Sequence, residues 1–396
     1  MGCFFLDDGR SLFCYRLMHL GVIFIIFFAP FINPLHYLGL LAGLIGWVYL
    51  IYQKKNSIDY ILNIPLVKLL LVLLVVSFIY IFYAEYTYYA LRKWSRILQA
   101  VVTYLIMFEI VKEDKIFIKF NHYLITFAGL IALHGLLYYF YVSPVRISVL
   151  FSVNTRAVYF LLLVFLPLSF AASKKISLTR KLWYTIVAGA MVFNVIITKT
   201  RGAWLGLVAG FIIYGFLRQK KILALIFIVL IAIVPLLPEG YISRANTIFE
   251  FDDPRIEGWE KAWHMLTERN VLLGVGPGNY HALAQYEYDI SGGMRRHTHN
   301  LIIQFIIELG LFGFIYIVVF ITNLAVLIHK IRKAVSAEEN IKRDFVLAFS
   351  SLYVAFLVHT LTHLSIHNRS TAALAMFILA CFAKLLQEKK VTTRLT

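Results

Sequence analysis

Residues 299–330 read HNLIIQFIIELGLFGFIYIVVFITNLAVLIHK, and this stretch decides the class of fold. Between Asn300 and His329 the only side chain with a full charge is that of Glu308. A helix needs roughly 20 apolar residues to cross the hydrocarbon core of a bilayer, so a run of this length is typical of a transmembrane helix.

Runs of the same kind recur on both sides of this stretch. Of the 396 residues, 61% are hydrophobic and only 15% are charged, and the mean hydropathy is +0.78. Soluble domains are nearer half apolar and a quarter charged, which excludes that class. Charged or proline-rich breaks divide the chain into about twelve apolar runs. Because the runs are continuous rather than alternating, a β-barrel is excluded. The sequence predicts an all-α integral membrane protein with about 12 transmembrane helices.

The distribution of lysine and arginine predicts the orientation in the membrane. Basic residues outnumber acidic ones, which gives a net charge of +17. With an even number of spans both termini lie on one side, and 21 lysines and arginines fall in the connections of that side against eight in the short connections opposite. Positively charged connections stay in the cytoplasm. We therefore expect a multi-pass protein of the inner (cytoplasmic) membrane with both termini in the cytoplasm.

One long connection divides the chain into three parts. We expect transmembrane helices 1–9 in residues 1–237, a periplasmic helical module in 238–298, and helices 10–12 with a cytoplasmic tail in 299–396. Within the module, Asp253-Pro254 is an N-cap signal that opens a helix through Glu268, with Arg255 and two tryptophans at helical spacing. Residues 274–279, GVGPGN, predict a tight turn and are only weak support for phosphate binding.

Three polar residues at the outer ends of spans are candidates for chemistry: Arg201, Arg255 and His299. Arg201 lies in the short connection between spans seven and eight, Arg255 opens the periplasmic helix, and His299 opens span ten. If span ten is one straight helix, Gly310 and Gly313 lie on the same face as His299, where another helix can approach closely. The alternative is a packing helix with a capping histidine. Lys68, Glu109, His134 and His359 lie inside spans without evident partners.

The pattern His299-Asn300-x9-Gly310-x2-Gly313, after a large loop carrying Arg255 and a turn Thr200-Arg201-Gly202-Ala203, resembles the O-antigen ligase family and its polymerase relatives. The resemblance covers most of the chain and implies a GT-C-like architecture. It also implies that Arg201, Arg255 and His299 are the functional positions.

The function implied by this resemblance is transfer of a glycan from undecaprenyl pyrophosphate to lipid A-core oligosaccharide on the periplasmic face. The implied enzyme is an inverting, metal-independent glycosyltransferase that uses no cofactor. Its partners are the lipid-linked donor, the lipid A-core or glycan acceptor and membrane lipids, with no nucleic acid. A polymerase that extends a surface polysaccharide shares the signature and is the alternative. A polytopic transporter is less favoured, because the polar clusters lie at the outer boundary rather than at the midplane.

The chemistry of the residues is consistent with this reading. Arginine presents a planar fork of donors that suits pyrophosphate oxygens, and histidine is a suitable general base for an acceptor hydroxyl. No extracytoplasmic Asp-x-Asp pair is present, so the sequence requires no metal. Seven further cations flank outward connections and are candidates either for pyrophosphate binding or for interfacial anchoring: Arg92, Arg96, Arg146, Arg156, His363, His367 and Arg369.

Overall fold

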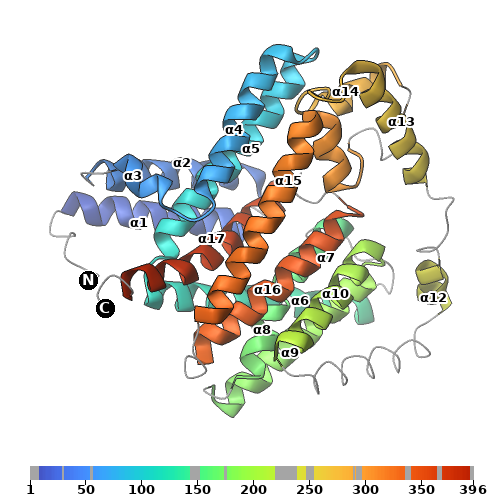
Figure 1. Ribbon diagram of the computed structural model, residues 1–396. Helices are drawn as coiled ribbons and strands as arrows, with labels where there is room; N and C mark the ends of the chain where they lie inside the picture. Colours follow the sequence, from blue (N-terminus) through green and yellow to red (C-terminus); the bar gives the residue numbers. More distant parts are fainter. Residues whose placement is uncertain are drawn as a thin grey trace.

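A computed structural model describes residues 9–28, 31–53, 57–142, 152–173, 176–218, 239–246, 254–288, 290, 297–334, 340–363 and 368–392. Every regular element in these ranges is a helix, as the sequence predicted (Figure 1). Within the described ranges, six stretches are long and apolar enough to cross a membrane: Pro34–Tyr52, Thr87–Val111, Asp114–Tyr141, Val153–Ala171, Leu178–Ile197 and Leu301–Lys330. The count of about twelve spans stays a prediction, since residues 219–238, expected to hold span nine, lie outside the described ranges.

The N-terminal part is a set of closely packed helices. They are α1 (Gly9–Ile23) with a π-helical extension (Phe24–Phe28), α2 (Asn33–Tyr52), α3 (Ser57–Leu62), α4 (Val67–Ile79) with a 3₁₀ turn (Tyr80–Tyr83), α5 (Thr87–Val111) and α6 (Asp114–Tyr141). α1 and α2 approach through glycines: a Cβ added to Gly21 would lie 2.5 Å from the carbonyl oxygen of Gly39. Small residues allow such contact where helices have only packing to hold them together.

The central helices share the main hydrophobic core with α5 and α6. They are α7 (Val153–Leu161), α8 (Phe165–Ala171), α9 (Leu178–Ile197), α10 (Arg201–Arg218), α16 (Asn340–Thr360) and α17 (Arg369–Thr392). α10 packs along α16, and α17 packs against α5. Gly206 makes the first pairing possible, because a Cβ there would lie 2.5 Å from the carbonyl oxygen of Ala355. α10 and α16 are thereby held in close contact.

The region between α10 and α16 contains α12 (Glu239–Asn246), α13 (Pro254–Arg269), α14 (Asn279–Tyr286) and α15 (Leu301–Ala334). α13 begins at Pro254 and ends one residue beyond Glu268, so that predicted helix is confirmed. α13, α14 and the first part of α15 share their own small apolar core, which includes Leu266, Tyr280 and Ile307. These helices pack on one another, and the bounds of the module predicted between residues 238 and 298 stay a prediction.

The prediction that span ten is one straight helix is wrong. Gly310 has φ 60° and ψ −142°, so α15 is sharply kinked there. The rings of Phe305 and Tyr316 stack with centroids 5.9 Å apart, whereas eleven residues of straight helix would span about 16 Å. Gly310 and Gly313 therefore do not lie beneath His299 on one face. Glycine is needed at 310 because a backbone with positive φ strains other residues.

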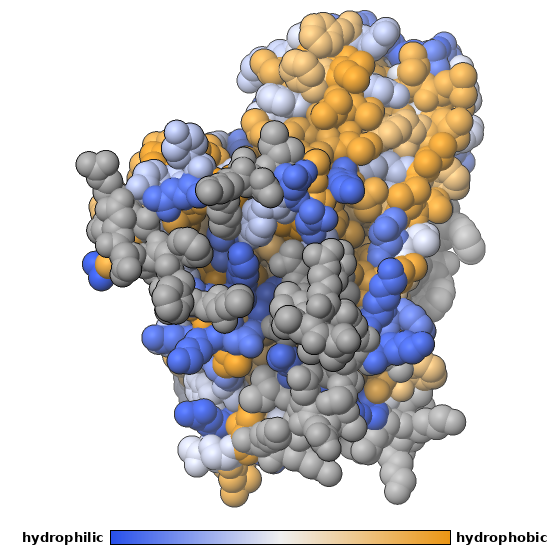
Figure 2. Space-filling view, turned by 60° about the vertical axis from the view of Figure 1, so that its left-hand side comes forward, coloured by the Kyte–Doolittle hydropathy of each residue, from blue (hydrophilic) through white to orange (hydrophobic). Residues whose placement is uncertain are grey.

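Hydrophobic side chains cover a broad part of the molecular surface (Figure 2). Exposed examples are Val75 and Phe78 on α4 and Phe314 and Val318 on α15. A large continuous apolar surface is unusual on a soluble monomer and is expected of helices that face lipid. The membrane class predicted from composition is therefore consistent with the surface of the folded chain.

Candidate active site

His299 occupies a strained turn immediately before α15. Its φ of 55° lies in the left-handed region, which is uncommon for residues other than glycine. The turn is fixed on both sides, because the indole nitrogen of Trp259 donates to the carbonyl oxygen of Thr298 at 2.7 Å and the amide of Thr298 donates to Oε1 of Gln304 at 2.8 Å. Oδ1 of Asn300 accepts from the amides of Ile302 and Ile303 and thus caps α15. Strain held in this way is typical of a functional position.

His299 lies within a group of four histidines. Its Nδ1 is 3.3 Å from Nδ1 of His363, in the turn after α16. The ring of His297 is 4.3 Å from that of His299, and the ring of His359 is 5.7 Å from that of His363, centroid to centroid. Among the residues that the structure describes, no three His, Cys, Asp or Glu side chains have the arrangement of a metal site.

The environment of His363 favours its neutral form. Burial lowers its pKa, and the neighbouring His359, His299, His297 and Arg255 lower it further. A neutral His363 can accept a hydrogen bond at Nδ1 from an Nδ1–H of His299. That tautomer leaves Nε2 of His299 as an acceptor, because the bond made by one ring nitrogen determines the state of the other.

Arg201 is the first residue of α10 and lies beside this group. The next residue, Gly202, packs against the end of α16: a Cβ there would lie 1.7 Å from Oγ1 of Thr362 and 3.2 Å from Nδ1 of His359. The tight turn predicted between two spans is confirmed, since α9 ends at Ile197 and Lys199 has φ 50°. Glycine at 202 thus allows the positive N-terminus of α10 to reach the histidines.

Arg255 enters the site from the module. It lies in the first turn of α13, and its charge is close enough to lower the pKa of His363. Arg201, Arg255 and His299 therefore converge from three separate parts of the chain, together with His363 from a fourth. Of the further cations named from the sequence, His363 joins this group, as far as the described residues show.

A buried polar chain attaches the His299 turn to α5. Nε2 of Gln304 donates to Oε1 of Glu308 at 2.8 Å, and Oε2 of Glu308 is 3.3 Å from Nζ of Lys93. Gln304 also accepts from Thr298, so the chain runs from α5 to the residue before His299. These hydrogen bonds lie in the interior, where the low dielectric constant makes each of them stronger than at the surface. They fix the position of the turn relative to the membrane helices.

The glycine-rich loop after α13 has a structural role. The amide of Val275 donates to the carbonyl oxygen of Ile307, and the amide of Gly276 donates to the carbonyl oxygen of Glu308, both at 2.9 Å. In the opposite direction, the amide of Leu311 donates to the carbonyl oxygen of Leu272 at 3.1 Å. Gly274, Gly276 and Gly278 all have positive φ. The loop is thereby bound along the kink in α15, and its amides at 275 and 276 are occupied by protein.

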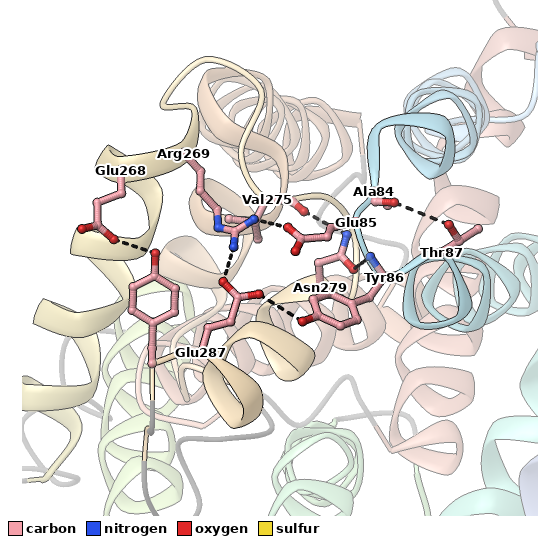
Figure 3. Close-up of polar contacts among 10 residues, drawn as sticks. Ala84, Glu85, Tyr86, Thr87, Glu268, Arg269, Val275, Asn279 and Glu287 are labelled. Carbon is pink, nitrogen blue, oxygen red and sulfur yellow. Dashed lines mark hydrogen bonds and ion pairs between the residues drawn. The ribbon is translucent and has the colours of Figure 1, made fainter.

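A charged latch joins the module to the start of α5 (Figure 3). Arg269 forms ion pairs with Glu85 and with Glu287, and Glu287 accepts from the hydroxyl of Tyr86 at 3.0 Å. Beneath it, the buried side chain of Asn279 accepts from the amide of Tyr86 at 3.1 Å and donates to the carbonyl oxygen of Val275 at 2.9 Å. Burial lowers the pKa of Arg269, but the bonds to Glu85, Tyr288 and Glu287 outweigh it and raise that pKa.

A second group of cations lies on other helices. Arg92 and Arg96 are on α5, and Arg369 begins α17 with its guanidinium carbon 4.9 Å from the ring centroid of Tyr37 on α2. Arg92 and Arg369 are close enough to repel the charge of Arg96. Arg96, Arg369 and His36 line a cavity of about 410 Å³. We call Arg92, Arg96, Arg369 and His36 the arginine cluster.

Among the described residues, Arg156 joins neither group. Arg156 is fully buried in α7, and its Nε donates to Oδ1 of Asn194 on α9 at 3.1 Å. Its guanidinium fits against Gly135, where a Cβ would lie 1.9 Å from one of its nitrogens. Arg146 and His367 lie outside the described residues.

Sequence reasoning missed several members of the site. His297 was not singled out, although the His297-Thr298-His299 alternation could have pointed to it. His359 was read as isolated, yet it is four residues before His363, the spacing that places two side chains on one face of a helix. Nothing local in the sequence indicated that Gln304 would bond the backbone at Thr298.

Comparison with known proteins bears on the family. No curated protein matches the chain. Residues 186–318, however, match the family model described as O-Antigen ligase, and that segment contains Arg201, Arg255 and His299. This match supports the O-antigen ligase family, to which the sequence shows a resemblance.

Proposed function

We propose that the protein is an O-antigen ligase-like glycosyltransferase that moves a glycan from undecaprenyl pyrophosphate to lipid A-core oligosaccharide on the periplasmic face. One observation carries the proposal. Arg201, Arg255 and His299, far apart in the sequence, lie near one another at the ends of helices within the segment that matches the family. Two arginines and a helix N-terminus suit a pyrophosphate, and a histidine suits an attacking hydroxyl.

In the reaction, an acceptor hydroxyl attacks the anomeric carbon from the face opposite the pyrophosphate. The bond between that carbon and the phosphate oxygen breaks, the new glycosidic bond forms, and the configuration inverts. The hydroxyl proton passes to Nε2 of His299, while the electron pair leaves with the polyprenyl pyrophosphate. His363 supports this role by accepting from Nδ1 of His299, whose nitrogen lies 3.3 Å away.

Arg201 and Arg255 stabilise the departing pyrophosphate. Negative charge grows on its oxygens in the transition state, and prearranged donors at that place contribute much of the rate enhancement. Each arginine lies in the first turn of a helix, where the backbone amides add positive potential. The proposed reaction needs no metal and no cofactor.

A ligase and a polymerase of this family differ in the acceptor that receives the glycan. A polymerase would use the growing glycan instead of lipid A-core, and the convergence of Arg201, Arg255 and His299 serves both reactions equally. Deletion of the gene followed by gel analysis of surface glycans tests the proposal. Loss of a ligase leaves complete chains on the carrier lipid, whereas loss of a polymerase leaves single repeats. An unchanged glycan pattern would contradict both.

The proposed side of the membrane follows from the charge asymmetry in the connections. With the native cysteines replaced, a cysteine at the exposed position Glu260 should react with an impermeant thiol reagent in intact spheroplasts. The matched control is a cysteine at the exposed position Lys333, which should be protected until the membrane is broken. The reverse pattern would place the site in the cytoplasm.

A further inference from the structure

The cavity beside the arginine cluster has the shape of a site for an amphiphile. Its walls are formed by α4, α5, α15, α16 and α17 and are mainly aliphatic and aromatic, with Leu70, Ile97, Phe320, Phe356 and Met376 among them. Its volume of about 410 Å³ is within the range of ligand sites, roughly 300–1,000 Å³. Apolar atoms make up most of the surface of this lining. A hydrocarbon chain fits such walls better than water does.

The charges that line the cavity do not balance. Lys93, Arg96 and Arg369 are basic, and among the lining residues Glu308 is the only carboxylate. Glu308 is already paired with Lys93 at 3.3 Å. Two guanidinium charges therefore remain at the cavity without a facing carboxylate in its lining, next to the imidazole of His36.

The two guanidinium groups also have unused donors. Nε of Arg96 and Nε of Arg369 are buried, and neither has a hydrogen-bond partner among the described residues. A buried donor that stays unpaired destabilises the fold, and more so when it belongs to a charged group. The positive charges of Arg92 and Arg369 also repel the positive charge of Arg96, which is a second penalty. An anion between these side chains would remove both penalties.

The arginine cluster is distinct from the histidines of the candidate active site. The charges that act on His363 come from His359, His299, His297 and Arg255, and those that act on Arg96 come from Arg92, Arg369 and Tyr37. The cavity nevertheless approaches the active site, because Leu301 and Thr360 belong to its wall and follow His299 and His359 closely in the chain. A molecule in this cavity would lie next to the proposed reaction centre.

We propose that the arginine cluster binds the phosphate group of a second amphiphile, with its hydrocarbon in the cavity, while the pyrophosphate of the donor occupies the site at Arg201, Arg255 and His299. The protein then holds two lipid phosphates at once. Two sources share this chemistry: a lipid-linked acceptor and a phospholipid of the membrane. The inference rests on the proposed function only for the identity of the first lipid, because binding is measured without glycan transfer.

The test counts lipids bound to the full-length chain. Purified protein in detergent is titrated with undecaprenyl phosphate and analysed by native mass spectrometry. We expect two molecules per wild-type chain, one for the Arg96→Gln/Arg369→Gln variant and one for the Arg201→Gln/Arg255→Gln variant. Because a charge-assisted hydrogen bond is worth about 1.5–3 kcal/mol, affinity at the altered site should fall at least about tenfold. Arg180→Gln, an exposed arginine at the start of α9, is the matched control and should still bind two.

Further outcomes decide the proposal and the source of the lipid. A wild-type chain that binds only one molecule, or an Arg96→Gln/Arg369→Gln variant that still binds two, would overturn it. Competition with dioleoyl phosphatidylglycerol distinguishes the sources: displacement of one molecule from the wild type identifies a membrane phospholipid, and retention of both identifies a lipid-linked acceptor. To separate binding from folding, lipid-free Arg96→Gln should melt no lower than the wild type, since the substitution removes a repelled charge. If Arg96→Gln melts lower, the arginine is structural and the proposal fails.

Discussion

The candidate active site and the arginine cluster differ in how their polar groups are held. Around His299 the backbone and side chains are bonded to Trp259, Gln304 and His363. In the arginine cluster, the Nε atoms of Arg96 and Arg369 are buried without a partner in the described chain. A region whose groups are fixed by protein is prepared for a reaction, because geometry is set before the substrate arrives. A region with unused donors is prepared for binding. Substitutions in the two regions should therefore have different signatures.

The largest effect is expected for His299→Gln. Glutamine keeps some hydrogen bonding but cannot accept a proton near pH 7, so transfer should fall by about 10²–10⁴ with donor affinity largely kept. In the wild type, activity should rise as pH increases through the pKa of the base, because the base must be neutral. His363 stays neutral over that range since its pKa is lowered. Steady-state rates and donor titrations between pH 5.5 and 8.5, with EDTA present, measure this.

A contrasting result would redefine His299. If His299→Gln weakens donor binding instead, and wild-type activity falls with rising pH, then His299 is a cationic pyrophosphate contact. His264→Gln is the matched control, because His264 lies on α13 with its side chain 66% exposed. It should keep wild-type rates.

The next largest loss of transfer activity is expected for Arg201→Lys and for Arg255→Lys. Lysine keeps the charge but loses the planar fork of donors, so transfer should fall about tenfold, and about a hundredfold or more for the alanine variants. Expression should remain near normal. Glycan transfer from a lipid-linked donor is the assay, with the exposed Arg180→Lys as control. Near-wild-type activity in both alanine variants would remove the arginines from the site.

A smaller effect is expected for Gln304→Leu, which breaks the chain from Lys93 and Glu308 to the His299 turn. The buried amide of Thr298 loses its acceptor, and a displacement of the reacting group by even 1 Å can cost up to about a hundredfold. We expect roughly a tenfold loss in transfer rate with donor affinity unchanged. Asn323→Leu, an exposed position further along α15, is the control. Equal activity of the two variants would show that the turn holds its shape without Gln304.

The smallest effect is expected for Arg269→Ala in the latch. Its partners Glu85 and Glu287 are 50% and 33% exposed, and ion pairs of this kind contribute about 1 kcal/mol or less. The melting temperature should drop by about 2 °C or less, most clearly at low salt, and transfer should be nearly unchanged. A large loss of activity without a change in melting would mean that the latch positions Arg255 rather than only holding the module.

The sequence by itself determined the class of protein. Continuous apolar runs such as that of residues 311–328 can be satisfied only by helices in a membrane, since lipid offers the backbone no hydrogen bonds. Local signals were also sufficient for the start of α13 at Pro254 and for the turn before Arg201, because capping and tight connections depend on neighbours in sequence. The pattern around His299 was enough to indicate the family.

Only the tertiary structure decided how these residues meet. The kink at Gly310 depends on Leu272 and Gly276 bonding to α15 from another segment, and the helical spacing in the sequence could not reveal it. The pairing of His299 with His363, and the division of the arginines between two regions, likewise depend on packing between distant helices. Apolar periodicity fixes which residues are buried, but several arrangements of the same helices bury them equally well. Long-range polar contacts select one of those arrangements. Such contacts join residues far apart in the chain, so no local sequence pattern predicts them.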